Sequence, residues 1–291
     1  MEKAQTTKKE VKTKMWKPWK LLELIKQDIL DKKWSLLGMG ILIGVMGFYV
    51  ISLISSLDFT QMQAYIESLP EALRAILGGG LDLANPYSLT NAYFYSFIWL
   101  YLGIFIIYIT SSLIPQEVEN HTIDLTLSKP ITRTRYLTGK ILFVYAFITA
   151  ILAITTIFIA LGMSTAPTFL EYGLHWDRLL AAFLLATLHL GTMASTSVFF
   201  STVFLDTKKT TIASVVVMFI MFFIGDFSSL LNPNLGETIQ YASTWTYYNT
   251  AQVFGTGNFN SLPQNILILL AINIILSIVS LIVFRRKDIP V

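Results

Sequence analysis

Six long runs of apolar residues constrain what this chain can fold into more than any other feature of the sequence. About 20 consecutive apolar residues are enough for a helix to cross the hydrocarbon core of a bilayer. Because lipid offers no hydrogen bonds, the backbone of such a run must satisfy its own polar groups, and it does so as a helix. We therefore predict an all-α integral membrane protein with six transmembrane helices, over residues 36–57, 92–114, 140–163, 179–205, 211–231 and 265–284.

The composition agrees with this class and excludes several functions. The chain is 54% hydrophobic and 13% charged, whereas a soluble domain carries roughly 25% charged residues. It contains no cysteine, so it can form no disulfide, thiolate zinc site or cysteine nucleophile. It also lacks the phosphate-binding GxxxxGK(S/T) loop and the HExxH and GxSxG motifs. We therefore expect a chain that is not itself an enzyme and holds no metal or other cofactor.

The basic residues are distributed so unevenly that they predict an orientation. With the N-terminus in the cytoplasm, nineteen of the 21 Lys and Arg residues lie on the cytoplasmic side, and only Arg74 and Arg178 lie outside. An excess of Lys and Arg in cytoplasmic loops is the general topological signal. We therefore expect both termini in the cytoplasm of a prokaryotic cell, with the chain in the inner or cell membrane. The net charge of +3 follows from this distribution and does not indicate a nucleic-acid partner.

A second kind of helix is predicted before the first span. Between Trp16 and Trp34, apolar residues recur at steps of three and four, and lysines and acids fill the positions between them. A helix with tryptophan on one face and lysine on the other tends to lie in the membrane interface. We expect such an elbow helix over 16–35, after a disordered basic tail over 1–15, and a cytoplasmic tail over 285–291. The alternative is that the elbow segment simply extends the first span.

The segment between the last two spans, residues 232–264, is rich in Tyr, Trp, Asn and Gly. Tyr and Trp favour the depth of the membrane interface. The segment could therefore dip back into the outer face of the membrane, or it could be an ordinary exposed loop.

Three polar residues inside the predicted spans are candidates for the wall of a translocation path: His189, Ser195 and Asp226. An ionisable group within a span is costly and is a candidate for function. Asp226 and His189 also have simpler interpretations. Asp226 follows Gly225 and could mark a bend near the outer end of its span, whereas His189 could be an interior residue with a hydrogen-bond partner.

The long loop predicted at 115–139 carries the strongest pattern in the sequence. Glu117 and Glu119 stand where the second span leaves the membrane, and Thr122 is a suitable cap for a short helix. Pro130 would end that helix, because the residue before a proline is driven out of helical geometry. A capped helix lying across this loop could press against another protein. The alternative is a charged loop that only sets the topology.

This loop resembles that of the ABC-2-type transporter permease family. The family pattern is E-x-G-T-(I/L)-x-x-L-L-(S/T)-x-P-(I/V)-(S/T)-R, followed by a Gly-Lys pair that opens the third span. This chain has Gly139-Lys140 and, before it, Glu119-Asn120-His121-Thr122-Ile123-Asp124-Leu125-Thr126-Leu127-Ser128-Lys129-Pro130-Ile131-Thr132-Arg133. His121 departs from the pattern, because glycine is usual there. The family's six spans, elbow helix and cytoplasmic termini match the predictions above, so the resemblance covers nearly the whole chain.

The resemblance implies the permease subunit of an ABC exporter. Two copies, or this chain and a similar one, would pair in the membrane, and each would dock a separate cytoplasmic ATPase that holds ATP and Mg²⁺. The substrate would be lipophilic or amphipathic, such as a drug, a peptide or a lipid. The residues that would couple to the ATPase are Glu117, Glu119, His121, Thr122, Ile123, Asp124, Leu125, Leu127 and Arg133.

Two other functions stay open on the sequence alone. A membrane sensor or partner subunit, bound to an ATPase without transporting anything, would use the same loop. A membrane enzyme would need paired catalytic residues at one depth. Its only candidates are His189 and Asp226, which we expect at different depths.

Overall fold

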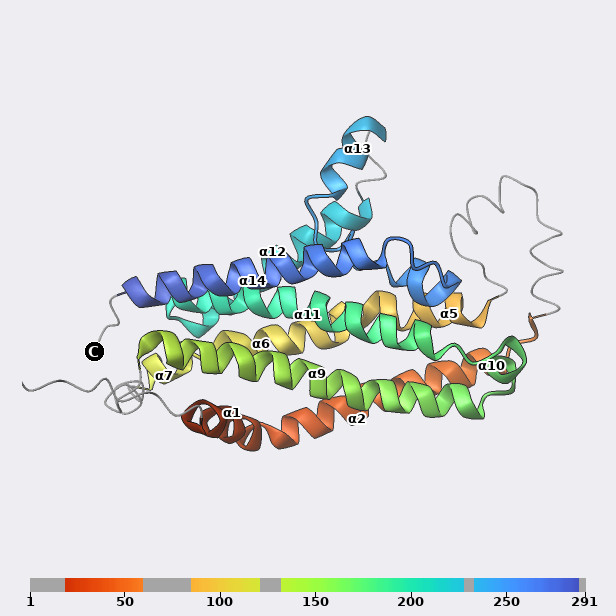
Figure 1. Ribbon diagram of the computed structural model, residues 1–291, viewed down its shortest axis with the longest axis horizontal. Helices are drawn as coiled ribbons and strands as arrows, with labels where there is room; N and C mark the ends of the chain where they lie inside the picture. The colour runs from red at the N-terminus through yellow and green to blue at the C-terminus, as the bar shows by residue number, and fades with distance from the viewer. Residues whose placement is uncertain (1–18, 60–84, 121–131, 228–232, 288–291) are drawn as a thin grey trace, which may run out of the picture.

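The computed structural model describes residues 19–59, 85–120, 132–227 and 233–287. Over these residues the chain is helical, without a strand. Six helices are long and apolar enough to span a membrane: Lys33–Ser55, Pro86–Glu119, Arg133–Thr165, Trp176–Phe204, Thr207–Asp226 and Leu262–Arg286. They extend along the long axis of the molecule (Figure 1), which confirms the all-α class and the six spans. The tail predicted at 1–15 lies outside the described residues.

Four of the spans start three or four residues earlier than the apolar runs indicate. These are α2 (Lys33–Ser55), α11 (Trp176–Phe204), α12 (Thr207–Phe227) and α14 (Leu262–Arg286). Hydropathy marks only the part of a helix that matches the bilayer core, whereas helical geometry continues into polar residues at its ends. The last residues of the predicted fifth span, 228–231, lie outside the described residues.

The second span is longer and less regular than predicted. It consists of α5 (Pro86–Tyr93), a 3₁₀ turn η1 (Tyr95–Phe97), a π-helical turn η2 (Trp99–Gly103), α6 (Ile104–Ser112) and α7 (Pro115–Glu119). The prediction of a start at residue 92 was wrong because residues 86–91 include polar side chains that are buried within the protein. Asn85 caps this start, with its side-chain Oδ1 accepting the Tyr87 N–H at 2.9 Å.

The third span, α9 (Arg133–Thr165), begins seven residues before the predicted start at Lys140. Thr132 caps it, accepting a hydrogen bond from the backbone N–H of Arg135 at 3.4 Å. Because α7 and the start of α9 are helical, the predicted loop 115–139 was too long. Residues 121–131 of that loop lie outside the described residues.

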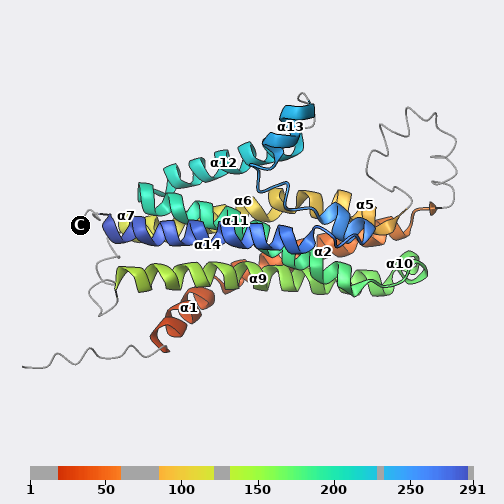
Figure 2. The ribbon, with the colours of Figure 1, turned by 45° about the horizontal axis from the view of Figure 1, so that its top comes forward.

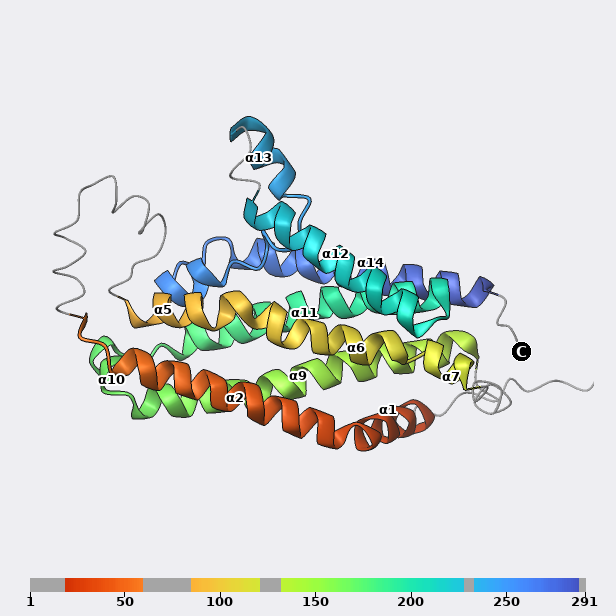
Figure 3. The same cartoon turned by 180° about the vertical axis from the view of Figure 1, so that it is seen from behind.

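Close contact between α2 and α9 holds the first and third spans together. A Cβ atom added to Gly44 of α2 would lie 2.7 Å from Phe158 Cδ2 of α9, so only glycine fits there without a shift. Apolar attraction between helices is weak in lipid, and small residues that allow close approach provide the packing instead. Seen from behind, α5 and α6 lie between α2 and α12 (Figure 3).

The segment before the first span forms a separate helix, α1 (Trp19–Asp31). The helix is interrupted at Lys32, and α2 begins at Lys33. Figure 2 shows α1 set at an angle to α2 and α9, so it is not a straight extension of the first span. Ile25 and Ile29 pack against the core. Its position in a membrane interface stays a prediction.

The segment between the last two spans returns into the bundle. After α13 (Pro233–Gln240), which stands out from the side of the molecule (Figure 1), the chain turns inward and forms a π-helical turn, η4 (Ala251–Thr256). Ser243, Tyr248, Val253 and Phe254 are buried. The interpretation as an ordinary exposed loop is therefore wrong for residues 243–254.

Candidate functional site

Two regions of the structure bring polar and charged residues together. The first lies at the end of the bundle where α7, the start of α9 and the end of α14 meet (Figure 1), which we call the α7 end. The second lies inside the bundle, between α11 and its neighbours. The sequence-predicted site residues that the structure describes are divided between these regions.

Lys140 lies at the centre of the α7 end. Its ammonium is 3.0 Å from Asp28 Oδ1 of α1 and 2.9 Å from Glu117 Oε1 of α7, and its side chain is only 6% exposed. One buried cation therefore ties the elbow helix to the second and third spans. Burial raises the pKa of the Asp28 carboxyl, and the neighbouring Lys140 ammonium opposes that rise without cancelling it.

Glu119 joins the end of the second span to the start of the fifth. Its Oε1 accepts the backbone N–H of Thr207 at 2.8 Å, and its Oε2 accepts the Thr207 hydroxyl at 3.1 Å. Asp206 also caps α12, accepting the backbone N–H of Lys209 at 2.8 Å. This backbone donor lowers the pKa of Asp206. A helix N-terminus favours negative charge, so both acids stabilise the start of α12.

Arg133 lies at the same end and is held by the other end of the chain. Its guanidinium donates to the backbone carbonyl of Lys287 at 2.7 Å. The Lys287 ammonium in turn donates to the carbonyl of Val203, at the end of α11, at 2.9 Å. The α7 end thus gathers Glu117, Glu119 and Arg133 of the predicted coupling residues. The other six, His121, Thr122, Ile123, Asp124, Leu125 and Leu127, lie outside the described residues.

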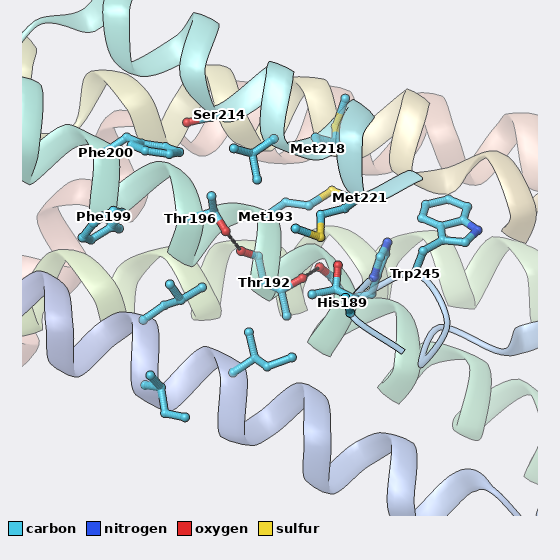
Figure 4. Close-up of a pocket in the computed structure, with 16 residues that line it drawn as sticks. His189, Thr192, Met193, Thr196, Phe199, Phe200, Ser214, Met218, Met221 and Trp245 are labelled. Atoms are coloured by element: carbon cyan, nitrogen blue, oxygen red, sulfur yellow. Dashed lines mark hydrogen bonds between the residues drawn. The ribbon is translucent and has the colours of Figure 1, made fainter. Parts of the chain in front are cut away.

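A cavity of about 430 Å³ lies between α11, α12, α14 and the returning segment after α13 (Figure 4). Its walls are mostly apolar, with hydroxyls and one imidazole at intervals. The lining residues are His189, Thr192, Met193, Thr196, Phe199, Phe200, Ser214, Val217, Met218, Met221, Ala242, Thr244, Trp245, Ile272, Ile275 and Leu276.

His189 lies at one end of this cavity, near Trp245 and Met221 (Figure 4). The residue is completely buried, its ring stacks on Tyr248 at 4.5 Å, and it meets Trp245 edge-on at 5.1 Å. Within the described part of the chain, neither ring nitrogen has a hydrogen-bond partner. The sequence-based interpretation of an interior histidine was right about its position and wrong about its hydrogen bond.

A second cavity, of about 340 Å³, lies beyond Trp245, whose side chain lines both spaces. Asp226 lines this second cavity from the last turn of α12, together with polar residues such as Asn91 and Thr246. An aromatic cluster stands at the boundary, with Trp99 stacked on Phe222 at 4.5 Å and Trp245 edge-on to Phe222 at 5.1 Å.

Gly225 allows the returning segment to reach this boundary. A Cβ atom added at Gly225 would lie 2.5 Å from the Cβ of Trp245, a distance that real Cβ contacts do not show. Any larger residue would displace Trp245 and with it the wall between the two cavities.

Ser195 belongs to a third set of residues. The hydroxyls of Ser195 and Tyr145 are 2.7 Å apart, and Asn273 Oδ1 accepts from Tyr145 at 2.8 Å and from Ser195 at 3.2 Å. This network joins α9, α11 and α14 inside the bundle. Sequence reasoning missed Tyr145 and Asn273, although Asn273 interrupts an otherwise apolar run and was a visible signal.

The three predicted path residues are therefore not one site. His189 and Asp226 line different cavities, which removes the paired arrangement that a membrane enzyme would need. No group of three His, Cys, Asp or Glu side chains that could hold a metal ion occurs among residues the structure describes.

Six spans, with a charged cluster that links helices at one end, are the architecture of a multi-pass membrane protein. The model of the family described as "ABC-2 family transporter protein" matches residues 24–289. The chain therefore belongs to the ABC-2 transporter family, and it is the permease subunit of an ABC transporter. A comparison with curated protein sequences gives no match.

Proposed function

We propose that this permease is an exporter subunit whose α7 end faces the cytoplasm and docks a separate ATPase. Two permease subunits would pair, and ATP and Mg²⁺ would be held by the ATPase chains. The orientation rests on the excess of Lys and Arg at this end and in the adjoining segments.

One observation carries the coupling part of the proposal. The segment 120–132 is flanked by α7 and α9, and the residues beside it contact α1, through Lys140 and Asp28, and α12, through Glu119 and Thr207. A partner that moves this segment would therefore act on the elbow helix and on three spans at once.

Coupling of this kind requires that the contacts differ between two states of the transporter. The ion pairs of Lys140 and the cap at Thr207 are suited to that role, because they are polar contacts between helices and not continuous apolar packing. ATP-driven closure of the ATPase pair would shift the segment 120–132, and these contacts would pass the shift to the spans.

The substrate class that fits best is lipophilic or amphipathic. The larger internal cavity has mostly apolar walls, and the smaller one beyond Trp245 is more polar. A molecule with an apolar body and a polar end would find a matching surface in each.

Co-purification tests this function directly. The tagged chain would be expressed from its native operon, extracted in detergent and analysed by mass spectrometry. We expect an ATPase with a phosphate-binding loop in a one-to-one ratio. Its loss is expected when residues 122–127 are replaced by Gly and Ser. A matched control carries Glu171→Ala, an exposed acid of α10 (Pro167–Tyr172) at the opposite end, and should retain the ATPase.

A folded chain that carries no ATPase would refute the exporter proposal. If an ATPase binds but none of the compounds tested changes its ATP hydrolysis, the sensor function would replace the exporter proposal.

A further inference from the structure

We infer that the cavity between α11, α12 and α14 is the binding site of one uncharged molecule with an apolar body and a single hydrogen-bonding group, which bonds to His189. As the loading site of an exporter this inference rests on the proposed function. The binding itself does not require the ATPase and is tested without it.

The state of His189 is the first support. A neutral imidazole carries one N–H donor and one acceptor nitrogen, and both ring nitrogens here are buried without a partner among the described residues. Leaving a buried polar group unsatisfied costs free energy that a ligand hydroxyl or amide could recover. The ring forms part of the cavity wall (Figure 4), so a small shift of the neighbouring side chains would bring a ligand in the cavity to its nitrogens.

The walls of the cavity select the rest of the molecule. Its volume of about 430 Å³ falls within the roughly 300–1,000 Å³ typical of small-molecule sites. No Asp, Glu, Lys or Arg is among the described residues that line the cavity, so a charged group would lose its hydration without gaining a charged partner among them. Met193, Met218 and Met221 can adjust to differently shaped apolar bodies, because methionine side chains are flexible.

The position of the cavity indicates where the molecule enters. Ile275 of α14 lines the cavity and is exposed on the surface. Exposed apolar residues flank it on both helices, with Ile212 at 64% and Val216 at 49% on α12 and Ile274 at 49% on α14. A surface of this composition faces lipid, so the occupant would enter sideways from the bilayer.

Photolabelling tests the inference on the full-length chain in phosphatidylethanolamine–phosphatidylglycerol vesicles. Three probes would share one diazirine-bearing octyl chain and end in a hydroxyl, a methyl or a carboxylate group. Labelled residues would be located by peptide mass spectrometry. We expect saturable labelling of the cavity-lining residues by the alcohol, weaker labelling by the alkane, and none by the carboxylate at neutral pH.

Two substitutions of His189 isolate the hydrogen bond. His189→Leu should lower the apparent affinity of the alcohol by about tenfold, to that of the alkane, because one hydrogen bond is lost. His189→Gln keeps a donor and an acceptor and should restore most of the difference. The matched control is Ser280→Ala, which changes a buried polar residue of α14 outside the cavity and should alter neither probe.

A further variant tests the cavity without changing His189, so the test does not depend on whether the His189 variants fold. Val217→Trp adds bulk to the cavity wall and should abolish saturable labelling by both the alcohol and the alkane. An unchanged preference for alcohol over alkane in His189→Leu would overturn the inference. So would labelling of the lipid-facing Ile212 and Ile274 that is as strong and as saturable as labelling of the cavity. Neither outcome bears on whether an ATPase binds.

Discussion

At the scale of single residues, Lys140 shows how tertiary contacts change the meaning of a residue. In the sequence it is one of several basic residues next to a span. In the structure it is a buried cation between two carboxylates from different helices. Removing Lys140 would break both ion pairs at once, and breaking a buried ion pair leaves an uncompensated charge.

Lys140→Ala is therefore expected to destabilise the chain by about 3–5 kcal/mol, since Asp28 and Glu117 would be left facing each other without a cation. The measurement is thermal unfolding of the purified protein in detergent. Lys209→Ala is the control, because Lys209 is 71% exposed in its pair with Asp206 and exposed pairs contribute little to stability. Equal effects of the two variants would contradict the role given to Lys140.

Asp28 gives the fold a predictable dependence on pH. Its pKa is raised above the unfolded value of 3.8 by burial, so ionisation costs more in the folded state than in the unfolded one. Its contribution to stability is complete below the unfolded pKa and is lost as the pH rises through the folded pKa. Asp28→Asn removes this loss, and the stability of wild type relative to the variant should fall from pH 4 to pH 7. Melting temperatures of both proteins across that range would check it, and a difference that stays constant or grows would exclude it.

At the scale of helices and segments, irregular elements create the internal spaces. The second span is broken by η1 and η2, and the segment after α13 returns to the middle of α11, where Tyr248 stacks on His189. Regular helices alone would pack side by side. The π-helical and 3₁₀ turns instead place Trp99 and the aromatic cluster between two cavities. Such turns inside helices often mark functional positions.

The contact between α2 and α9 makes opposite predictions for two glycines of the same helix. Gly38→Ala should be neutral or slightly stabilising, because a Cβ there meets nothing within 4 Å and alanine favours helix. Gly44→Ala should destabilise by about 1–3 kcal/mol, because the new Cβ would collide with Phe158. Thermal unfolding of the two variants side by side is the measurement. If Gly44→Ala proves as stable as Gly38→Ala, the two helices do not approach as closely as the structure places them.

At the scale of the whole molecule, the polar contacts at the α7 end link more elements than those at any single point inside the bundle described here. They join α1, α7, α9, α12 and the end of α14, whereas the polar network of Ser195, Tyr145 and Asn273 joins only α9, α11 and α14. This arrangement suits a subunit that is moved from one end by a partner.

The double variant Glu117→Ala with Glu119→Ala is expected to insert and pair with its ATPase but to uncouple it. Lys140 keeps Asp28 as a partner, whereas the contacts from α7 to α9 and α12 are lost. The measurement is ATP hydrolysis by the co-purified complex, with and without a transported compound. Glu171→Ala is the matched control at the opposite end. Coupled hydrolysis that persists unchanged in the double variant would show that these acids transmit nothing.

The sequence by itself determined the class, the number of spans and the family. Each of these depends on local composition: apolar runs of bilayer length and a linear motif near Glu119 and Pro130. Helices in lipid satisfy their own backbone, so their existence needs no knowledge of their neighbours. The limits of the second and third spans were missed, because the buried polar residues at 88–91 and the cap at Thr132 act through neighbours and backbone geometry that hydropathy does not measure.

Only the tertiary structure decided which polar residues meet. His189, Ser195 and Asp226 all lie on the predicted spans, yet one lines an apolar cavity, one joins a network with Tyr145 and Asn273, and one lines a polar cavity beyond Trp245. The pairing of Lys140 with Asp28 spans more than a hundred residues of sequence. Such contacts depend on how helices cross and on where a chain returns, and those are set by packing between distant segments, which no local pattern encodes.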